Sequence, residues 1–201
     1  MRAAAAAAVP AATITEAAGL AAAIQALDAT PDTDLVLLDL HMPDSRGLTG
    51  LAALRAQFPG VAVLVVSGHD EATVVRRVLD HGAAGFMPKS APPEQIGEAI
   101  RSVLACGSWV PAQLAAVVAA ARSDPHDTEL ARRLTRLTGQ QFRVLGLLAE
   151  GRLNKQIADT LGIQERTVKA HVSAIFEKLG VRNRTQAGVL LRQLDLNPPA
   201  L

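Results

Sequence analysis

Three polar residues stand at or just after the ends of short apolar runs, and their types suit phosphoryl chemistry. They are Asp39, Ser67 and Lys89. A carboxylate in such a place can attack phosphorus and form an aspartyl phosphate. A hydroxyl and an ammonium beside it can hold the phosphoryl oxygens as negative charge moves onto them. Each residue alone is an ordinary loop residue, but the three together predict a phosphoacceptor site with Asp39 as its nucleophile.

The apolar runs that carry these residues predict buried parallel strands at 34–39, 61–66 and 84–87. Each run is continuously apolar, as expected for strands that helices cover on both faces. A weaker strand is expected near residues 12–17. Helical patterns alternate with the runs at residues 20–27, 47–57, 70–81 and 93–104. The series predicts a doubly wound α/β fold, in which the carboxyl ends of the strands meet at one edge.

A helical region follows, and no strand is predicted after Leu137. Four helices are expected, at residues 139–150, 154–161, 165–179 and 183–194. Asn154 is expected to cap the second of them, and Gly151, Gly162 and Gly180 are typical of helix ends. The short turn at residues 162–164 gives the spacing of a helix-turn-helix.

The helix at 165–179 has one apolar and one polar face. Its buried stripe is predicted to comprise Val168, Val172, Ile175, Phe176 and Leu179. The opposite face carries Arg166, Lys169, Ala170, Ser173 and Glu177. Lys169 is the best candidate for a contact with a DNA base. The alternative is an exposed ion pair with Glu165, which by itself stabilises a helix by only about 0.2 to 0.5 kcal/mol.

Charge is distributed unevenly along the chain, whose net charge is +1. Residues 131–201 hold 12 Lys/Arg against 5 Asp/Glu, a net +7, whereas residues 1–130 hold 8 against 14, a net −6. This asymmetry favours a basic module that binds a polyanion, and the acidic first part of the chain argues against a nonspecific DNA coat. Phosphate contacts are expected from Lys155, Arg166, Thr167, Lys178, Arg182 and Arg184.

The helical region closely resembles the LuxR/NarL-type DNA-binding domain. The resemblance is carried by Leu147-Leu-Ala-Glu-Gly151, Asn154-Lys-Gln-Ile-Ala158, Leu161-Gly-Ile163, Arg166-Thr-Val-Lys-Ala-His-Val172 and Lys178-Leu-Gly-Val-Arg-Asn-Arg-Thr185. It implies that the recognition helix enters the major groove of double-stranded DNA and that Lys169, Ala170 and Ser173 approach the bases. It also implies that the last helix pairs two protomers, here through Val189, Leu190 and Leu194. One departure is Gln164, which replaces a good capping residue at a cost of about 1 kcal/mol.

The first half of the chain resembles the receiver domain of two-component response regulators, a flavodoxin-like fold. The matching stretches are Leu37-Leu-Asp-Leu-His-Met-Pro43 with Gly47-Leu48, Ser67-Gly-His69, and Gly82-Ala-Ala-Gly-Phe-Met-Pro-Lys-Ser90. The resemblance implies that Asp39 accepts phosphate from a sensor histidine kinase, and that Ser67 and Lys89 bind the phosphoryl group. It further implies that Phe86 is the aromatic residue that switches on phosphorylation, and that the backbone carbonyl of His41 binds Mg²⁺.

One part of the receiver pattern is absent. Receivers begin with a strand that ends in a pair of acidic residues, and no such pair precedes Asp28. Residues 1–9 resemble the end of the first helix instead. In the strand order 2-1-3-4-5 the lost strand lies centrally, next to the strand at 34–39. We therefore expect poor Mg²⁺-dependent phosphorylation, and favour a start codon placed too late, or a fragment, over a natural receiver that works without phosphate.

These expectations give a receiver at residues 1–110 that is incomplete at its N-terminus, a helical linker at 111–136, and a LuxR-type domain at 137–201. The predicted function is a bacterial, cytoplasmic transcription regulator that is phosphorylated on an aspartate and binds promoter DNA as a homodimer. It is not expected to be an enzyme or to bind a membrane, and the single cysteine, Cys106, fits a reducing compartment.

Three alternatives remain. The first is a LuxR-type regulator with a degenerate receiver that acts independently of phosphorylation. The second is an aspartate-nucleophile phosphatase, which usually needs a second aspartate where this chain has His41. The third is a protein-interaction module, which the polar face around Lys169 disfavours.

Overall fold

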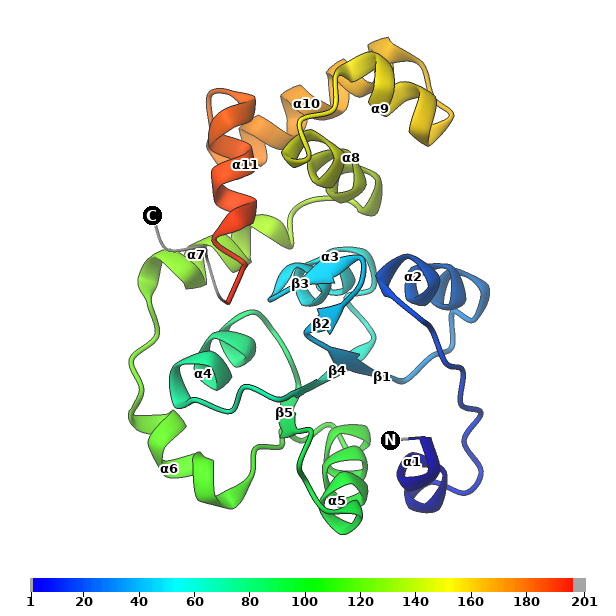
Figure 1. Ribbon diagram of the computed structural model, residues 1–201, viewed down its shortest axis with the longest axis vertical. Helices are drawn as coiled ribbons and strands as arrows, with labels where there is room; N and C mark the ends of the chain where they lie inside the picture. Colours follow the sequence, from blue (N-terminus) through cyan, green and yellow to red (C-terminus); the bar gives the residue numbers. More distant parts are fainter. Residues whose placement is uncertain (1, 197–201) are drawn as a thin grey trace.

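The computed structural model describes residues 2–196 and consists of an α/β unit and a helical unit (Figure 1). The α/β unit has the strands β1 (Leu35–Asp39), β4 (Ala62–Ser67) and β5 (Gly85–Pro88), and a hairpin of β2 (His41–Met42) and β3 (Ser45–Arg46). Its helices are α1 (Arg2–Ala8), α2 (Leu20–Ala29), α3 (Thr49–Gln57), α4 (Ala72–Asp80) and α5 (Pro93–Leu104). Two helices follow, α6 (Ala112–Ala120) and α7 (Pro125–Leu134). The helical unit comprises α8 (Gly139–Ala149), α9 (Asn154–Leu161), α10 (Glu165–Leu179) and α11 (Arg184–Arg192).

The main sheet is parallel, with the order β1-β4-β5. Its central strand β4 is buried along almost its whole length, which accounts for the continuous apolar run in the sequence. Alternate residues of β4 point to opposite faces. Val63 and Val65 therefore pack with α3 and α4, whereas Leu64 and Val66 pack with α1 and α5. The predicted doubly wound α/β arrangement is confirmed; each strand starts one residue later than expected, and β4 and β5 also end one residue later.

The prediction of a strand near residues 12–17 is wrong. Residues 12–18 adopt no regular secondary structure and make no ladder hydrogen bonds. A strand persists only when its backbone groups are paired with a neighbour. Among residues 2–196, no strand pairs with the edge of β1 that faces away from β4. The segment therefore lacks the central neighbour that would have held it in a sheet.

Helix ends follow the glycine pattern of the sequence, with one correction at a start. Gly162 and Gly180 end α9 and α10 in the left-handed region, at φ of 64° and 67°. Asn154 does not cap α9, because it is the first helical residue and Leu153 occupies the capping position. The exposed N–H of Leu153 is bound instead by the side chain of Gln156, at 2.8 Å.

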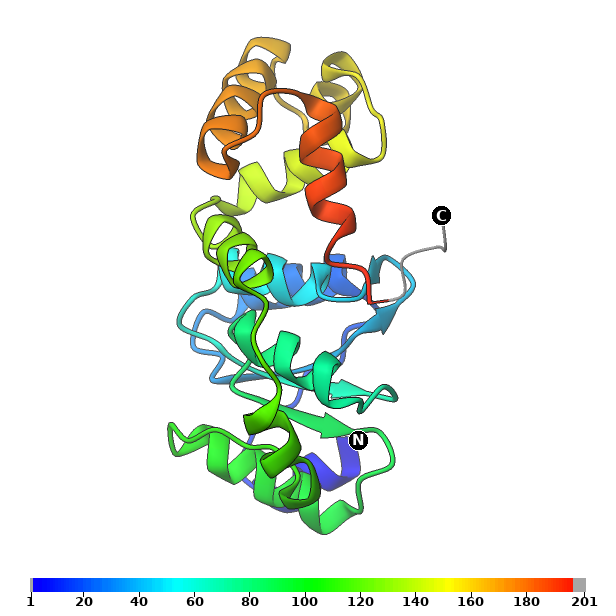
Figure 2. The ribbon, with the colours of Figure 1, turned by 90° about the vertical axis from the view of Figure 1, so that its left-hand side faces the viewer.

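Helix α7 connects the two units. It begins within the polar stretch 123–128, where the carboxylate of Asp124 accepts a hydrogen bond from the N–H of His126 at 2.8 Å and Pro125 occupies the first turn. It contacts α3 and α4 on one side and α10 on the other. Figure 2 shows this helix alongside the α/β unit, and the end of α11 descending to the same unit. One buried apolar cluster accordingly runs from the sheet into the helical unit.

Among the described residues, no helix is long and apolar enough to cross a membrane.

Candidate functional site

The predicted phosphoacceptor group assembles at the carboxyl edge of the parallel sheet. Asp39 is the last residue of β1, and the Nζ of Lys89 lies 2.6 Å from its Oδ2. Its other oxygen, Oδ1, accepts the backbone N–H of His41 at 2.9 Å. Lys89 is held in position because its own N–H donates to the carbonyl of Ser67 at 2.8 Å. The carboxylate and the ammonium are both partly exposed, so a phosphoryl donor can reach them.

Ser67 and Phe86 lie on β4 and β5, the other two strands of the sheet. Ser67 ends β4 and is completely buried, with its Oγ accepting the N–H of His69 at 3.1 Å. Phe86 lies on β5 and is also completely buried, within the apolar cluster of α3 and α4. Ser67 is thus one residue beyond Val66, the partner of Asp39 in the neighbouring strand, and Phe86 lies in the core.

The groups around Asp39 do not fit Mg²⁺. Mg²⁺ demands nearly octahedral oxygen coordination, usually with one or two carboxylates and several waters. Asp39, the carboxylate of the proposed phosphoacceptor group, is already paired with Lys89. Residues 2–196 contain no group of three or more His, Cys, Asp or Glu side chains arranged to hold a metal. His41 and His69 form a stacked ring pair, with centroids 4.9 Å apart and an interplanar angle of 22°, and His81 lies apart from them on the contact with α7.

Asp44 is a structural residue of this edge that the sequence analysis missed. Its two oxygens accept the N–H groups of Leu20 and Ala21, at 2.8 and 2.9 Å. The hydrogen bond from Ala21 is the main cause of a lowered pKa of the Asp44 carboxyl. Asp44 thus caps the N-terminus of α2 although it lies more than twenty residues away in sequence, so no local sequence pattern reveals this cap.

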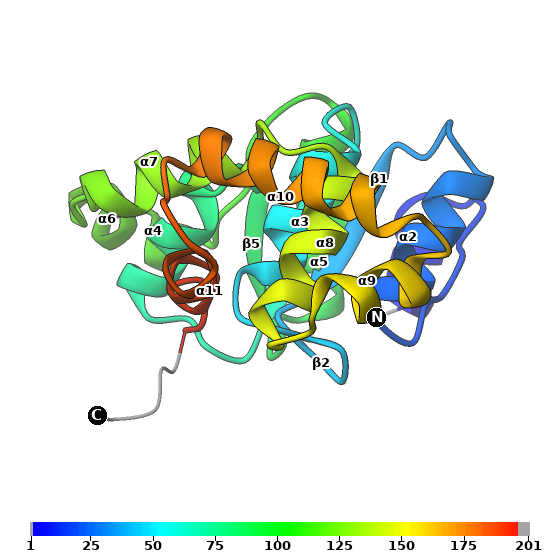
Figure 3. The same ribbon diagram turned by 90° about the horizontal axis from the view of Figure 1, so that it is seen from above.

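The proposed DNA-reading face lies on the first half of α10. Arg166, Lys169, Ala170 and Ser173 are all exposed, whereas Val168, Ile175 and Leu179 are completely buried. Figure 3 looks onto α9 and α10, which form the end of the molecule away from the sheet. Lys169 also pairs with Glu165 at 2.9 Å, and both side chains are largely exposed. An exposed pair of this kind is weak, so it can open when a polyanion competes for the lysine.

The basic residues expected at phosphates separate into two groups. Lys155, Arg166 and Arg182 are exposed, and Thr167 is half-buried. Lys178 instead donates to the side chain of the buried Gln141 at 2.7 Å. Arg184 donates to the carbonyl of Arg152 at 2.7 Å. These two side chains stabilise contacts within the helical unit.

The residues expected to form the contact between protomers differ in how deeply they are buried. Val189 is 46% exposed and Leu190 is half-buried, but the side chain of Leu194 is completely buried. The carbonyl of Leu194 accepts the N–H of Leu48, at the start of α3, at 2.8 Å. Leu194 therefore lies against the α/β unit in this conformation.

The C-terminus of α10 is held by a residue of α7 that the sequence analysis also missed. Arg133 donates from Nη1 to the carbonyl of Leu179 at 2.8 Å, and its Nε donates to Glu129 at 2.7 Å. A cation at this position satisfies a terminal carbonyl and opposes the negative end of the helix dipole.

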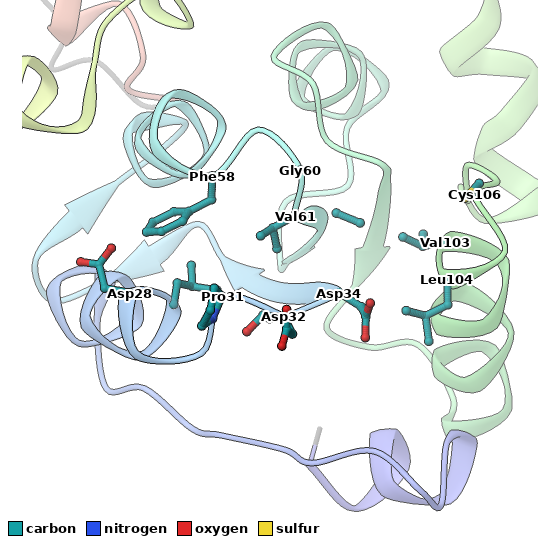
Figure 4. A pocket seen from close by; sticks show the side chains of 13 residues that line it. Asp28, Pro31, Asp32, Asp34, Phe58, Gly60, Val61, Val103, Leu104 and Cys106 are labelled. Carbon is teal, nitrogen blue, oxygen red and sulfur yellow. The ribbon is translucent and has the colours of Figure 1, made fainter.

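A pocket lies at the other end of the sheet from Asp39. It has a volume of about 700 Å³ and lies where β1 and β4 begin and α2 and α5 end. Figure 4 shows Phe58, Val61 and Leu104 around it, with Asp32 and Asp34 at its rim. It does not include Asp39, Ser67 or Lys89, so it is separate from the proposed phosphoacceptor group.

Comparison with known proteins agrees with both halves of the structure. Residues 5–101 match the response regulator receiver domain, and residues 135–191 match the bacterial regulatory proteins of the luxR family. The chain is 39% identical over 189 residues to the glycerol metabolism activator of Pseudomonas putida, covering 92% of this chain and 86% of that protein. It is 35% identical to the nitrate/nitrite response regulator NarL of Escherichia coli K12, covering 81% of this chain and 74% of that protein.

A solved structure is similar as well. It is RcsB of Salmonella enterica serovar Typhimurium, bound to the promoter rprA in the presence of the phosphomimetic BeF₃⁻. The identity is 23%, the coverage 87% of this chain and 82% of that chain, and the TM-score 0.47. The luxR-family match and the similarity to NarL place the chain in a family of transcription regulators, which are not enzymes. The chain belongs to the two-component response regulators that combine a receiver domain with a LuxR-type DNA-binding domain.

Proposed function

We propose that this response regulator binds promoter DNA as a homodimer through α10, and that a sensor histidine kinase phosphorylates Asp39. The proposed division is a receiver over residues 1–110, a linker over 111–136 and a DNA-binding domain over 137–201, in a cytoplasmic protein. In this proposal the linker transmits the state of the receiver to the DNA-binding domain.

The observation that carries the DNA-binding part is the face formed by Arg166, Lys169, Ala170 and Ser173, all exposed at the first half of one helix. A helix of this kind enters the major groove with its N-terminal residues on the base edges. Lys169 is proposed to read a base, since a lysine can donate to the acceptors O6 and N7 of guanine. Arg166, Lys155 and Arg182 are proposed to contact phosphates, and Val189 and Leu190 to contribute to the protomer contact.

The test of this part is selection of an operator from a pool of random duplexes, followed by mobility shifts on the selected sequence. Binding that requires two half-sites, and that Lys169→Ala weakens, supports the proposal. Equal binding of selected and scrambled duplexes would contradict it, because phosphate contacts alone carry no sequence information.

The phosphoacceptor part is supported by the 2.6 Å contact between Lys89 and Asp39, with Ser67 on the adjacent strand end. In this proposal an Asp39 oxygen attacks the phosphorus of the kinase phosphohistidine, the phosphorus–nitrogen bond breaks and the imidazole leaves, while the Lys89 ammonium compensates charge on the transferred phosphoryl group. Receivers typically use Mg²⁺ in this reaction, but the residues described around Asp39 do not fit the ion. Incubation with acetyl phosphate and a phosphate-affinity gel test the proposal, with Asp39→Asn as the control.

The poor fit of the described residues to Mg²⁺ favours a second candidate function. The chain can act as a DNA-binding regulator whose activity does not depend on phosphorylation. Under this alternative, Asp39→Asn would activate its promoter as well as the unaltered protein does. Under the first proposal it would not.

A further inference from the structure

One acidic residue lies within the face that is proposed to read DNA. Glu165 is the first residue of α10, and its carboxylate lies 2.9 Å from the Nζ of Lys169, one helical turn further on. Both side chains are largely exposed, at the end of the molecule away from the sheet (Figure 3). The phosphates of a DNA duplex repel a carboxylate that approaches them. A negative charge on this face therefore needs a physical reason.

Two structural effects account for Glu165 only in part. A carboxylate in the first turn of a helix interacts favourably with the positive end of the helix dipole. Glu165 is not the cap of α10, because Gln164 occupies that position and its side chain makes no capping hydrogen bond. The ion pair with Lys169 is exposed, and such pairs add little to helix stability. Neither effect involves DNA, so both predict that Glu165 has no influence on base preference.

A base pair presents a hydrogen-bond acceptor and a donor side by side in the major groove. In G·C they are O6 of guanine and the N4 amino group of cytosine, and in T·A they are O4 of thymine and the N6 amino group of adenine. An N–H···O hydrogen bond within the base pair joins the two atoms, so they lie about 2.9 Å apart. The ammonium of Lys169 and the carboxylate of Glu165 are separated by the same distance. The ion pair can therefore meet this edge without opening.

We propose that Glu165 and Lys169 act as one unit that reads the polarity of a base pair. The unit accepts a keto base, guanine or thymine, opposite Lys169 and an amino base, cytosine or adenine, opposite Glu165. The inference deepens the proposed function and rests on it in one respect, the entry of α10 into the major groove.

Reversal of the base pair makes both contacts repulsive. The ammonium then meets an amino group and the carboxylate meets a keto oxygen, so donor faces donor and acceptor faces acceptor. Glu165 thus determines specificity mainly by rejecting the reversed base pair. Among the accepted pairs, guanine is preferred to thymine because its N7 offers the lysine a second acceptor.

The test is the affinity of the full chain for duplexes that differ at one base pair. An operator is selected from random duplexes, and the position to vary is the one at which Lys169→Ala changes the base preference most. G·C and its reverse, C·G, are then placed at that position in both half-sites, and fluorescence anisotropy measures binding to each duplex. The ratio of the two affinities is compared between variants, because loss of a negative charge strengthens binding to every duplex. The unaltered chain is expected to prefer one orientation at least about tenfold.

Two substitutions of Glu165 separate its charge from its contact. Glu165→Gln keeps the length of the side chain, but an amide can donate as well as accept, so it no longer rejects a keto oxygen. The ratio should fall to about threefold or less, mainly because the reversed operator is bound more tightly. Glu165→Asp keeps the charge and the interaction with the helix dipole, but its shorter side chain withdraws the carboxylate from Lys169 and from the base. The ratio should fall in this variant as well.

Glu177→Gln is the matched control, since it removes the same charge from an exposed position near the other end of α10. Its ratio should stay within about twofold of that of the unaltered chain. An unchanged ratio in Glu165→Gln or Glu165→Asp would overturn the proposal, as would an equal fall in Glu177→Gln.

The same experiment distinguishes this inference from the proposed function. If the unaltered chain selects no operator, or if Lys169→Ala changes no base preference, base reading by α10 fails and the inference fails with it. If Lys169→Ala changes the preference at one position but Glu165→Gln keeps the ratio there, only the role of Glu165 is wrong.

Discussion

The ammonium of Lys89 lies 2.6 Å from Oδ2 of Asp39, so the carboxylate proposed as the nucleophile of the receiver is already held in an ion pair before phosphorylation. Replacing Lys89 with methionine keeps the length of the side chain and removes its charge. The rate at which acetyl phosphate modifies Asp39 should fall about 10²-fold, the usual effect of losing one group that stabilises developing charge. Phosphate-affinity gels over time measure it. Lys155→Met on α9 is the control, and an equal loss in both variants would remove Lys89 from the reaction.

Mg²⁺ should not stabilise this chain. An ion at 100 times its dissociation constant would add about 2.7 kcal/mol to the free energy of unfolding and raise the melting temperature by several degrees. Among residues 2–196 no three His, Cys, Asp or Glu side chains are arranged to hold a metal, so we expect no change in the melting temperature measured by calorimetry in millimolar MgCl₂. A Mg²⁺-dependent rise that disappears in Asp39→Asn would contradict the absence of a fit.

Lys169 and Arg166 should differ in how their loss affects DNA binding. Lys169→Ala is expected to cost about 1 to 3 kcal/mol on the selected operator and to relax the preference at one base pair. Arg166→Ala should weaken binding to selected and scrambled duplexes alike, and reduce by about one the number of ions released on binding, as given by the salt dependence of the affinity. Mobility shifts at several salt concentrations measure both effects. Arg132→Ala, at an exposed position on α7, is the control. If Lys169→Ala weakens binding to selected and scrambled duplexes by the same factor, Lys169 does not read a base.

Two glycines of the helical unit should respond to alanine with opposite signs. Gly162 ends α9 at φ 64°, where a Cβ has open space, so Gly162→Ala carries only the conformational cost of about 1 to 2 kcal/mol. Gly146 lies within α8 and also has open space around a Cβ, so Gly146→Ala should stabilise by about 0.5 to 1 kcal/mol. Urea unfolding measures both. Destabilisation by Gly146→Ala would show a packing constraint that the open space does not predict.

The contact between Arg77 and Asp127 should make stability depend on acid pH. Burial raises the pKa of the Asp127 carboxyl, but the hydrogen bonds from His81 and Arg77 outweigh it and hold the pKa well below its usual value of 3.8. A lowered pKa in the folded state means that the stabilisation is complete well above pH 4 and is lost as the pH falls further. Asp127→Asn should therefore cost about 3 kcal/mol at pH 7, since it leaves Arg77 without its partner charge.

That difference should shrink below about pH 4, where the aspartate of the unaltered chain begins to be protonated in the unfolded state. Urea unfolding at a series of pH values measures it, with Asp159→Asn, an exposed residue of α9, as the control. A difference that remains constant down to pH 2 would show that the carboxylate charge is not the source of the stabilisation.

The sequence by itself determined the parts that depend on local pattern or on fold topology. Asp39, Ser67 and Lys89 could be expected to converge, because the carboxyl ends of parallel strands share one edge. The ends of α9 and α10 could be placed at Gly162 and Gly180, since few other residues adopt a left-handed conformation without strain. The polar face around Lys169 followed in the same way from the helical period of its apolar partners.

Tertiary structure decided what depends on partners far apart in the chain. Residues 12–17 have a weak strand pattern, but none of the strands within residues 2–196 pairs with them, and without pairing a strand does not form. Lys178 and Arg184 are indistinguishable from DNA-binding residues in the sequence, yet their partners Gln141 and Arg152 hold them within the helical unit. Arg77 meets Gln193 across 116 positions. No periodicity reports such a contact, because it arises only when the receiver packs against the end of α11, and the same packing buries Leu194.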